Sequence, residues 1–263
     1  MSILLTETFN DQTLHGEFYD TFTAPTAYST TEQYSGNSCA KFTWDINDTE
    51  PNGVNTASRW TFTTTETIYT SFYWKLNSDW LGTGYGVHPH IIYITSDVDG
   101  DWANLEGGHL RVYIEVTDTV GNIRPRMIIG REGAASWHET TYNLTRSIWY
   151  HFETYHVMNT IGSSNGIMRM WVTPSGGATT LVYDSSSVLY RDADHTGMKF
   201  YEISIGPWIS PSSGVGSPYA QTMWMDELII GTEYLSTGRV GSLSMPNSRL
   251  CNKTNVRRLH PKL

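Results

Sequence analysis

The chain has 263 residues, of which 16% are charged and 13% aromatic, and its formal net charge at pH 7 is −9. A chain of this length buries a core without disulfide staples, and its many Trp, Tyr, Thr and Ser residues are typical of an all-β protein rather than a helical bundle. The negative charge argues against broad attraction to nucleic acid or to an anionic membrane, so we expect neither as a partner.

The start of the sequence predicts no signal peptide, because residues 1–5 are too short for an apolar signal core and carry no basic residue. No apolar run approaches the length of a membrane span. We therefore expect synthesis in the cytoplasm, with any place in a virion or outside the cell reached only after release. The two cysteines, Cys39 and Cys251, either form one bridge or stay as idle thiols, and their wide separation favours idle thiols.

Strand patterns separated by turn signals run along most of the chain. An N-terminal strand begins at Leu4, and a second strand follows the glycine turn at residues 35–38. The next strong pattern is residues 67–76, where Phe72, Trp74 and Leu76 share one face. Further strands are expected at residues 90–94, 109–116, 126–129, 180–183, 199–205 and 222–230. About a dozen strands without helical periodicity predict two antiparallel sheets.

The stretch 147–172 predicts a long hairpin, since an aromatic strand, a polar turn ending in Asn165-Gly166 and a returning strand follow one another. A period of two places one set of side chains on one side of the first strand: His151, Glu153 and Tyr155. The other side carries Tyr150, Phe152, Thr154, His156 and Met158. Both sides are bulky, which favours a central strand packed on one face and facing a groove on the other.

The succession of these signals resembles the concanavalin A-like (laminin G-like) jelly rolls. The segments that carry the resemblance are the first strand (Glu7-Thr8-Phe9-Asn10-Asp11), the turn Ser35-Gly36-Asn37-Ser38, the hairpin around Trp149 to Val172, and the closing strand from Trp224 to Gly231. The resemblance covers residues 4–235. It implies an all-β, two-sheet antiparallel β-sandwich at residues 1–240, with a curved sheet forming a groove, and a basic C-terminal tail at residues 241–263.

The groove of this architecture is expected to carry polar and aromatic side chains from two strand patterns. The alternation in residues 109–116 is the cleanest in the chain, with Leu110 and Val112 among those expected to face the core. The expected ligand-binding floor consists of His109, Arg111, Tyr113, Glu115, His151, Glu153, Tyr155, Arg169 and Trp171. Flat rings and hydrogen-bonding groups suit a polysaccharide or other glycan. Equally open is a polar sheet face whose residues only pair with each other.

Catalysis is the second hypothesis, because the resemblance includes glycan-binding modules, glycoside hydrolases and polysaccharide lyases alike. The hydrolase string Glu-x-Asp-x-x-Glu is absent, and residues 200–208 lack the lysine and tyrosine of the lyase string K-x-G-x-Y. As a lyase, the chain would use His109, Tyr113 and Arg111 as base, acid and carboxylate neutraliser on a uronic acid polymer. The leading hypothesis is a non-catalytic glycan-binding or surface-display module, and the alternative is a polysaccharide lyase or glycoside hydrolase acting in the groove.

The resemblance also implies a structural calcium ion that joins the first and last strands. The matching positions are Glu7 and Asp226, with carbonyl groups of the turn at Gly36, and the alternative is that both carboxylates are ordinary edge residues. The tail at residues 243–263 has no strand or helix period. We expect it either to lie along its own sandwich or to dock onto a second copy or onto capsid or tail proteins, as in a virion decoration or fibre component.

Overall fold

The computed structural model describes residues 3–12, 17–18, 27–46, 58–80, 87–96, 111–119, 122–131, 134–193, 196–205, 209–211 and 220–234. Residues 17–18, 27, 58–59, 87–89, 111–119, 131, 134 and 209–211 are described by their backbone alone. These residues form sixteen strands in two eight-stranded antiparallel sheets. No helix occurs in them, so none of these segments offers a helical membrane span. The predicted jelly-roll β-sandwich is therefore confirmed. The predicted tail at residues 241–263 and Cys251 lie outside the described residues.

One sheet, here called the front sheet, is built around the long hairpin at the middle of the chain. Its order is β13-β12-β11-β6-β16-β4-β3, with β1 also paired to β16. Its strands are β1 (Ile3–Glu7), β3 (Ala27–Ser29), β4 (Cys39–Trp44), β6 (Thr67–Leu76), β11 (Tyr150–Val157), β12 (Gly166–Pro174), β13 (Thr180–Val188) and β16 (Gln221–Gly231). The predicted first strand and closing strand thus lie side by side in this sheet.

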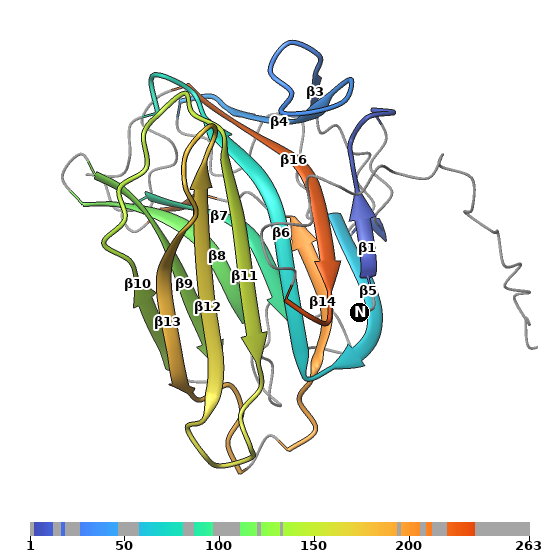
Figure 1. Cartoon of the computed structure of the whole chain (residues 1–263), viewed down its shortest axis with the longest axis vertical. Helices are drawn as coiled ribbons and strands as arrows, with labels where there is room; N and C mark the ends of the chain where they lie inside the picture. Colours follow the sequence, from blue (N-terminus) through green and yellow to red (C-terminus); the bar gives the residue numbers. More distant parts are fainter. Residues whose placement is uncertain are drawn as a thin grey trace, which may run out of the picture.

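The other sheet, here called the back sheet, lies behind the front sheet in Figure 1. Its order is β10-β9-β8-β7-β14-β5-β2, with β15 also paired to β7. Its strands are β2 (Glu17–Phe18), β5 (Ser58–Thr65), β7 (Val87–Thr95), β8 (Arg111–Thr119), β9 (Asn122–Arg131), β10 (Ala134–Glu139), β14 (Phe200–Ile205) and β15 (Ile209–Pro211). The sequence patterns did not predict β5 and β10.

The hairpin of β11 and β12 forms as the sequence predicts. Phe152 lies opposite Val172 of β12 and opposite Phe72 of β6, so β11 is an interior strand of the front sheet. Asn165 closes the turn by accepting a 2.7 Å hydrogen bond from the backbone N–H of Thr160. β12 must start with glycine, because a Cβ at Gly166 would lie 2.8 Å from the carbonyl oxygen of Val188.

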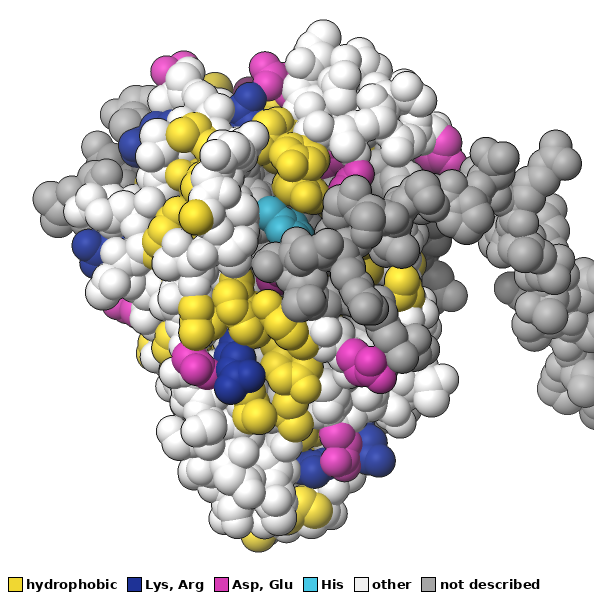
Figure 2. Space-filling model, viewed as in Figure 1, with side chains coloured by type: hydrophobic (Ala, Val, Ile, Leu, Met, Phe, Trp, Pro, Cys, Tyr) yellow, Lys and Arg dark blue, Asp and Glu magenta, His cyan; other side chains and the backbone are white. Residues whose placement is uncertain are grey.

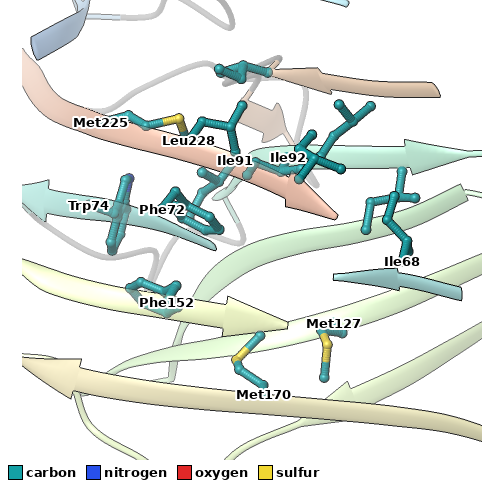
Figure 3. Packing of buried hydrophobic residues seen from close by; sticks show 14 of the residues in the cluster. Ile68, Phe72, Trp74, Ile91, Ile92, Met127, Phe152, Met170, Met225 and Leu228 are labelled. Carbon is teal, nitrogen blue, oxygen red and sulfur yellow. The ribbon is translucent and has the colours of Figure 1, made fainter. Parts of the chain in front are cut away.

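The core fills the space between the two sheets and takes side chains from both of them (Figure 3). On β11 the core residue Phe152 stacks on Phe72 at a centroid distance of 5.5 Å and meets Trp74 edge-on at 5.7 Å. The back sheet contributes buried residues such as Ile92 and Met127. Residues of β11 that alternate with Phe152 therefore point away from the core, onto the outer face of the front sheet.

The glycine turn before β4 is locked onto the end of the first strand. Gly36 has φ = 63°, and a Cβ there would overlap the side chain of Asn10 at 2.0 Å. Asn10 Oδ1 accepts a 2.6 Å hydrogen bond from the backbone N–H of Asn37. Cys39 starts the next strand as a buried free thiol that donates to the carbonyl oxygen of Glu32. These contacts anchor the loop of residues 30–37, which contains the turn, to the end of the first strand.

We expect His156 to make the fold sensitive to acid. It is fully buried between Tyr190, whose hydroxyl lies 3.0 Å from Nδ1, and Thr154, whose hydroxyl lies 3.1 Å from Nε2. Burial lowers its pKa from 6.5 to about 3, and the charge of His138 adds to this. Because the pKa of His156 is lower in the folded state, its contribution to the free energy of unfolding is fully present above pH 6.5. This contribution is lost as the pH falls towards about 3.

The measurement compares the free energy of unfolding of the wild type and of His156→Gln between neutral and acidic pH. The difference between the two should shrink by about 1.4 kcal/mol per pH unit below the ordinary histidine pKa, because only the wild type must keep a neutral imidazole buried. Taking the difference cancels the titrating groups that do not interact with His156. A difference that stays constant over this range would show that His156 is not the source of acid sensitivity.

Candidate functional site

The outer face of the front sheet carries the His151, Glu153 and Tyr155 side chains of β11, in agreement with the period-two pattern. Arg169 and Trp171 lie beside them on β12, where they pair with Tyr155 and Glu153. The structure therefore brings together five of the nine side chains that the sequence suggested for a ligand floor. Their role in binding a ligand stays a prediction.

The other predicted floor residues belong to a different sheet. β8, which contains Arg111, Tyr113 and Glu115, pairs with β7 and β9 in the back sheet. The structure therefore does not bring these positions onto the face that carries His151, and the expectation of one shared floor is wrong. The clean alternation of residues 109–116 predicted a strand correctly but could not say which sheet contains it. His109 lies outside the described residues.

A row of buried polar groups crosses the centre of this face from β6 to β11. The Tyr69 hydroxyl donates a 2.5 Å hydrogen bond to Glu153 Oε1, and the Ser71 hydroxyl lies 2.6 Å from His151 Nε2. His151 Nδ1 lies 3.8 Å from Glu153 Oε2, which has no hydrogen-bond partner although the Glu153 side chain is 0% exposed. Such a fully buried carboxyl oxygen is costly unless the group is protonated or shares a proton with a neighbour.

Burial sets the protonation states of this row. It raises the pKa of Glu153 to about 7, an effect that the hydrogen bond from Tyr69 partly offsets. It lowers the pKa of His151 to about 4, so the imidazole is neutral at pH 7. Burial likewise raises the pKa of Tyr69 and of Tyr73 far above the ordinary phenol value, so both phenols keep their protons. The site therefore offers a neutral proton acceptor beside neutral proton donors.

An aromatic pocket opens beside His151. The Tyr73 ring stacks on the His151 ring at 4.6 Å, and the Tyr34 ring stacks on Tyr73 at 3.6 Å. The pocket has a volume of about 170 Å³ and is lined by Tyr34, Tyr73, Trp149, His151, Thr173, Pro174, Ser175, Gly176, Gly177 and Thr179. In Figure 2 a histidine lies in a hollow of this face, with hydrophobic side chains on both sides. The turn between β12 and β13 forms the wall opposite the tyrosines.

Tyr34 reaches the pocket from a distant part of the sequence, and Asp226 of β16 holds it there. Asp226 Oδ2 accepts hydrogen bonds from the backbone N–H groups of Tyr34 (2.9 Å) and Ser35 (3.0 Å). Asp226 Oδ1 accepts a 2.9 Å bond from the N–H of Glu227, whose φ of 48° marks an irregularity in β16. The Glu227 carboxylate in turn accepts a hydrogen bond from the Ser35 hydroxyl. Asp226 thus acts as a positioning residue for one wall of the pocket.

The contacts of Asp226 bear on the calcium prediction. Three backbone N–H donors point at its carboxylate, and Glu7 Oε1 accepts a 3.0 Å bond from the N–H of Phe9. A calcium ion at this place would share the carboxylate oxygens with these N–H donors and would need further oxygen ligands. Within the described part of the chain, no group of three or more His, Cys, Asp or Glu side chains could hold a metal ion. Calcium binding at Glu7 and Asp226 stays a prediction.

A second aromatic group covers the other side of the polar row. The Tyr234 ring follows β16 and stacks on Trp171 of β12 at 4.5 Å, meeting Tyr69 edge-on at 5.9 Å and Tyr155 at 6.3 Å. Arg169, next to this group, forms a 2.8 Å ion pair with Asp184 of β13. The polar row is therefore shielded on the Tyr234 side and reaches solvent through the aromatic pocket.

Sequence reasoning missed the residues that β6 and the 30–37 loop supply. Tyr69, Ser71 and Tyr73 alternate with the predicted core residues of 67–76, so the same period-two pattern could have placed them on the groove face. Tyr34 could not have been found in this way, because its place depends on a contact with a residue 192 positions later in the chain.

Comparisons with known proteins support the fold. No family model matches the sequence, and neither does any curated protein. A marine PL-14 alginate lyase from Aplysia kurodai has a similar structure, with a TM-score of 0.60, 10% identity and coverage of 78% of this chain and 87% of that chain. Alginate lyase Aly36B has a TM-score of 0.60 with 14% identity, covering 88% and 97%. An endo-β-1,4-glucuronan lyase from Trichoderma reesei has a TM-score of 0.55 with 13% identity, covering 84% and 88%.

These identities are low, so the likeness concerns the jelly-roll architecture alone. It agrees with the fold that the sequence resemblance implied.

Proposed function

We propose that this protein is a polysaccharide lyase that cleaves a uronate-containing glycan by β-elimination in the aromatic pocket. The observation that carries the proposal is the stacked pair of a neutral imidazole, His151, and a neutral phenol, Tyr73, in the lining of that pocket. The similar folds of alginate and glucuronan lyases support it. The proposal replaces His109, Arg111 and Tyr113 as the candidate catalytic residues, since β8 lies in the back sheet.

The chemistry needs two proton transfers. A base removes the proton on the carbon next to the uronate carboxylate, the electron pair forms a carbon–carbon double bond, and the bond to the leaving glycosidic oxygen breaks. An acid then protonates that oxygen. His151 is the base in this scheme because it is neutral at pH 7, and it takes up the proton at Nδ1, since Nε2 is bonded to Ser71 and Glu153 Oε2 stays 3.8 Å from Nδ1. Tyr73 is the acid because it keeps its proton. The two rings lie 4.6 Å apart, close enough to serve neighbouring atoms of one sugar.

Three buried side chains position the base. Ser71 holds Nε2 of His151, and Glu153 lies on the Nδ1 side. Since the Glu153 pKa is about 7, the carboxyl group can share the proton that the imidazole takes up. Tyr69 fixes the other oxygen of Glu153 through its 2.5 Å hydrogen bond. The ring is thus oriented before substrate arrives, which lowers the cost of reaching the transition state.

Hydrolysis of the glycosidic bond fits the pocket less well. A glycosidase needs two carboxyl groups that flank the scissile bond. None of the described residues that line the pocket is Asp or Glu, and Glu153 lies fully buried beneath it. Elimination does not need two carboxyl groups of the protein, because a base takes the proton from carbon and an acid gives one to the leaving oxygen.

The proposal is tested by incubating the purified chain with alginate, glucuronan, glycosaminoglycans and algal or plant polysaccharides in which uronate alternates with neutral sugars. We expect at least one of them to yield products with the ultraviolet absorbance of an unsaturated uronate and new reducing ends in equal amount. Reducing ends without that absorbance would indicate hydrolysis instead. Binding without either product would support the non-catalytic glycan-binding hypothesis.

A further inference from the structure

We infer that the aromatic pocket binds a neutral sugar, so that the preferred substrate alternates uronate with neutral sugar residues. This inference rests on the proposed lyase function and narrows its substrate class. The uronate that reacts would lie at the edge formed by His151 and Tyr73, and the sugar on the other side of the scissile bond would fill the pocket. A pocket of about 170 Å³ has room for a single sugar ring.

The lining of the pocket matches an uncharged sugar. Thr173, Ser175 and Thr179 supply hydroxyl groups, and Tyr34 and Trp149 supply flat ring surfaces. Such a mixture binds sugar hydroxyls and C–H faces. No lysine or arginine is among the described residues of the lining. A carboxylate bound there would lose its hydration without gaining the charge-assisted hydrogen bonds that usually hold it.

The cations nearest to the pocket along the strands are already engaged. Lys75, two residues from Tyr73 on β6, forms a 2.5 Å ion pair with Glu32 and lies 5.4 Å from the Trp224 ring centre. Arg169, four residues before the lining residue Thr173 on β12, is paired with Asp184 at 2.8 Å. Each positive charge therefore has an adjacent negative charge, and neither adds a strong attraction for a polyanion.

The net charge of the whole chain also favours a substrate with fewer carboxylates. With a formal net charge of −9, the protein repels a polymer that carries a carboxylate on every sugar, and at low salt this repulsion slows association. A polymer in which neutral residues alternate with uronates carries about half the charge density. It can place its neutral residue in the pocket and keep its carboxylates outside.

The test compares kcat/KM for elimination on an alternating uronate–neutral polysaccharide with kcat/KM on the homopolymers alginate and glucuronan. We expect the alternating polymer to be preferred by at least about tenfold, which corresponds to about 1.4 kcal/mol. Thr179→Lys places a cation in the pocket, so it should reduce that preference. Thr180→Lys is the matched control, since Thr180 is exposed and adjacent in sequence but does not line the pocket.

The possible failures are distinguishable. Equal or faster cleavage of the homopolymers would overturn the inference and leave the proposed function standing. Absence of elimination on every polymer would overturn the proposed function. A binding measurement then tests whether the aromatic pocket holds a neutral sugar. Oligosaccharides of the alternating polymer, with uronate and neutral sugar in turn, should then change the tryptophan fluorescence of the wild type but not of Tyr34→Ala. No binding of these oligosaccharides to the wild type would overturn the inference as well.

Discussion

His151→Gln and Tyr73→Phe should each lower kcat/KM for elimination by at least about 100-fold, the usual minimum contribution of a positioned general acid or base. Gln keeps a polar side chain of similar length but cannot accept a proton at neutral pH. Phe keeps the ring that stacks on His151 and Tyr34 and removes only the hydroxyl proton. Because the stack is kept, binding of an uncleaved oligosaccharide to Tyr73→Phe should change by no more than a few fold.

The matched control for this loss is His138→Gln. His138 is half-buried, its pKa is lowered by burial, and its Nδ1 lies 2.6 Å from a tyrosine hydroxyl, that of Tyr183. Like His151, it has a pKa lowered by burial and a ring nitrogen 2.6 Å from a hydroxyl group, but it joins β10 to β13 at the edge of the sandwich and does not line the pocket. We expect near wild-type activity from it. Equal loss in both histidine variants, or full activity in folded His151→Gln, would contradict the assignment of His151 as the base.

Much of the fold could be predicted from alternation alone. The segment 67–76 coincides with β6, and the stretch around Asn165-Gly166 forms the predicted hairpin of β11 and β12. Strands with one core face and one groove face leave a strong period of two in the sequence. β5 has Trp60 and Phe62 in alternation with polar residues, but this short pattern adjoins a long polar stretch and does not by itself predict a strand.

The candidate site was only partly predictable. Alternation assigned His151 and Glu153 to the groove face, since these residues alternate with Phe152 in the core. The same rule could not tell that β8 pairs within the back sheet, because a period of two gives the face of a strand and not the identity of its neighbours. Strand order depends on long-range pairing, which a single sequence without homologues does not display.

Asp226 shows that the contacts of a single side chain are equally hard to predict from one sequence. Its place in the closing strand suggested a calcium ligand by resemblance, and a buried acidic residue near a glycine turn fits that suggestion. In the structure its carboxylate accepts three backbone N–H bonds and fixes Tyr34 against the pocket, while calcium binding there stays a prediction. The sequence contained the carboxylate and the turn, but only the folded chain shows which donors occupy the oxygens.

Phe152→Ala should lower the free energy of unfolding by about 3–5 kcal/mol, the usual cost of truncating a buried phenylalanine. Phe152 is 0% exposed, stacks on Phe72 and meets Trp74 edge-on, so its loss leaves a cavity between two strands that carry the site. Tyr155→Ala on the same strand is the control. Its ring lies on the opposite, groove face and is only partly buried, so we expect a loss of about 1 kcal/mol.

Urea denaturation of the two variants measures both values. A large loss for Phe152→Ala and a small one for Tyr155→Ala would establish which side of β11 faces the core, and therefore which side presents His151 and Glu153 to the pocket. Similar losses for both would mean that the two faces are equally buried. The aromatic pocket could not then be an open site, and the proposed reaction would have no place on this sheet.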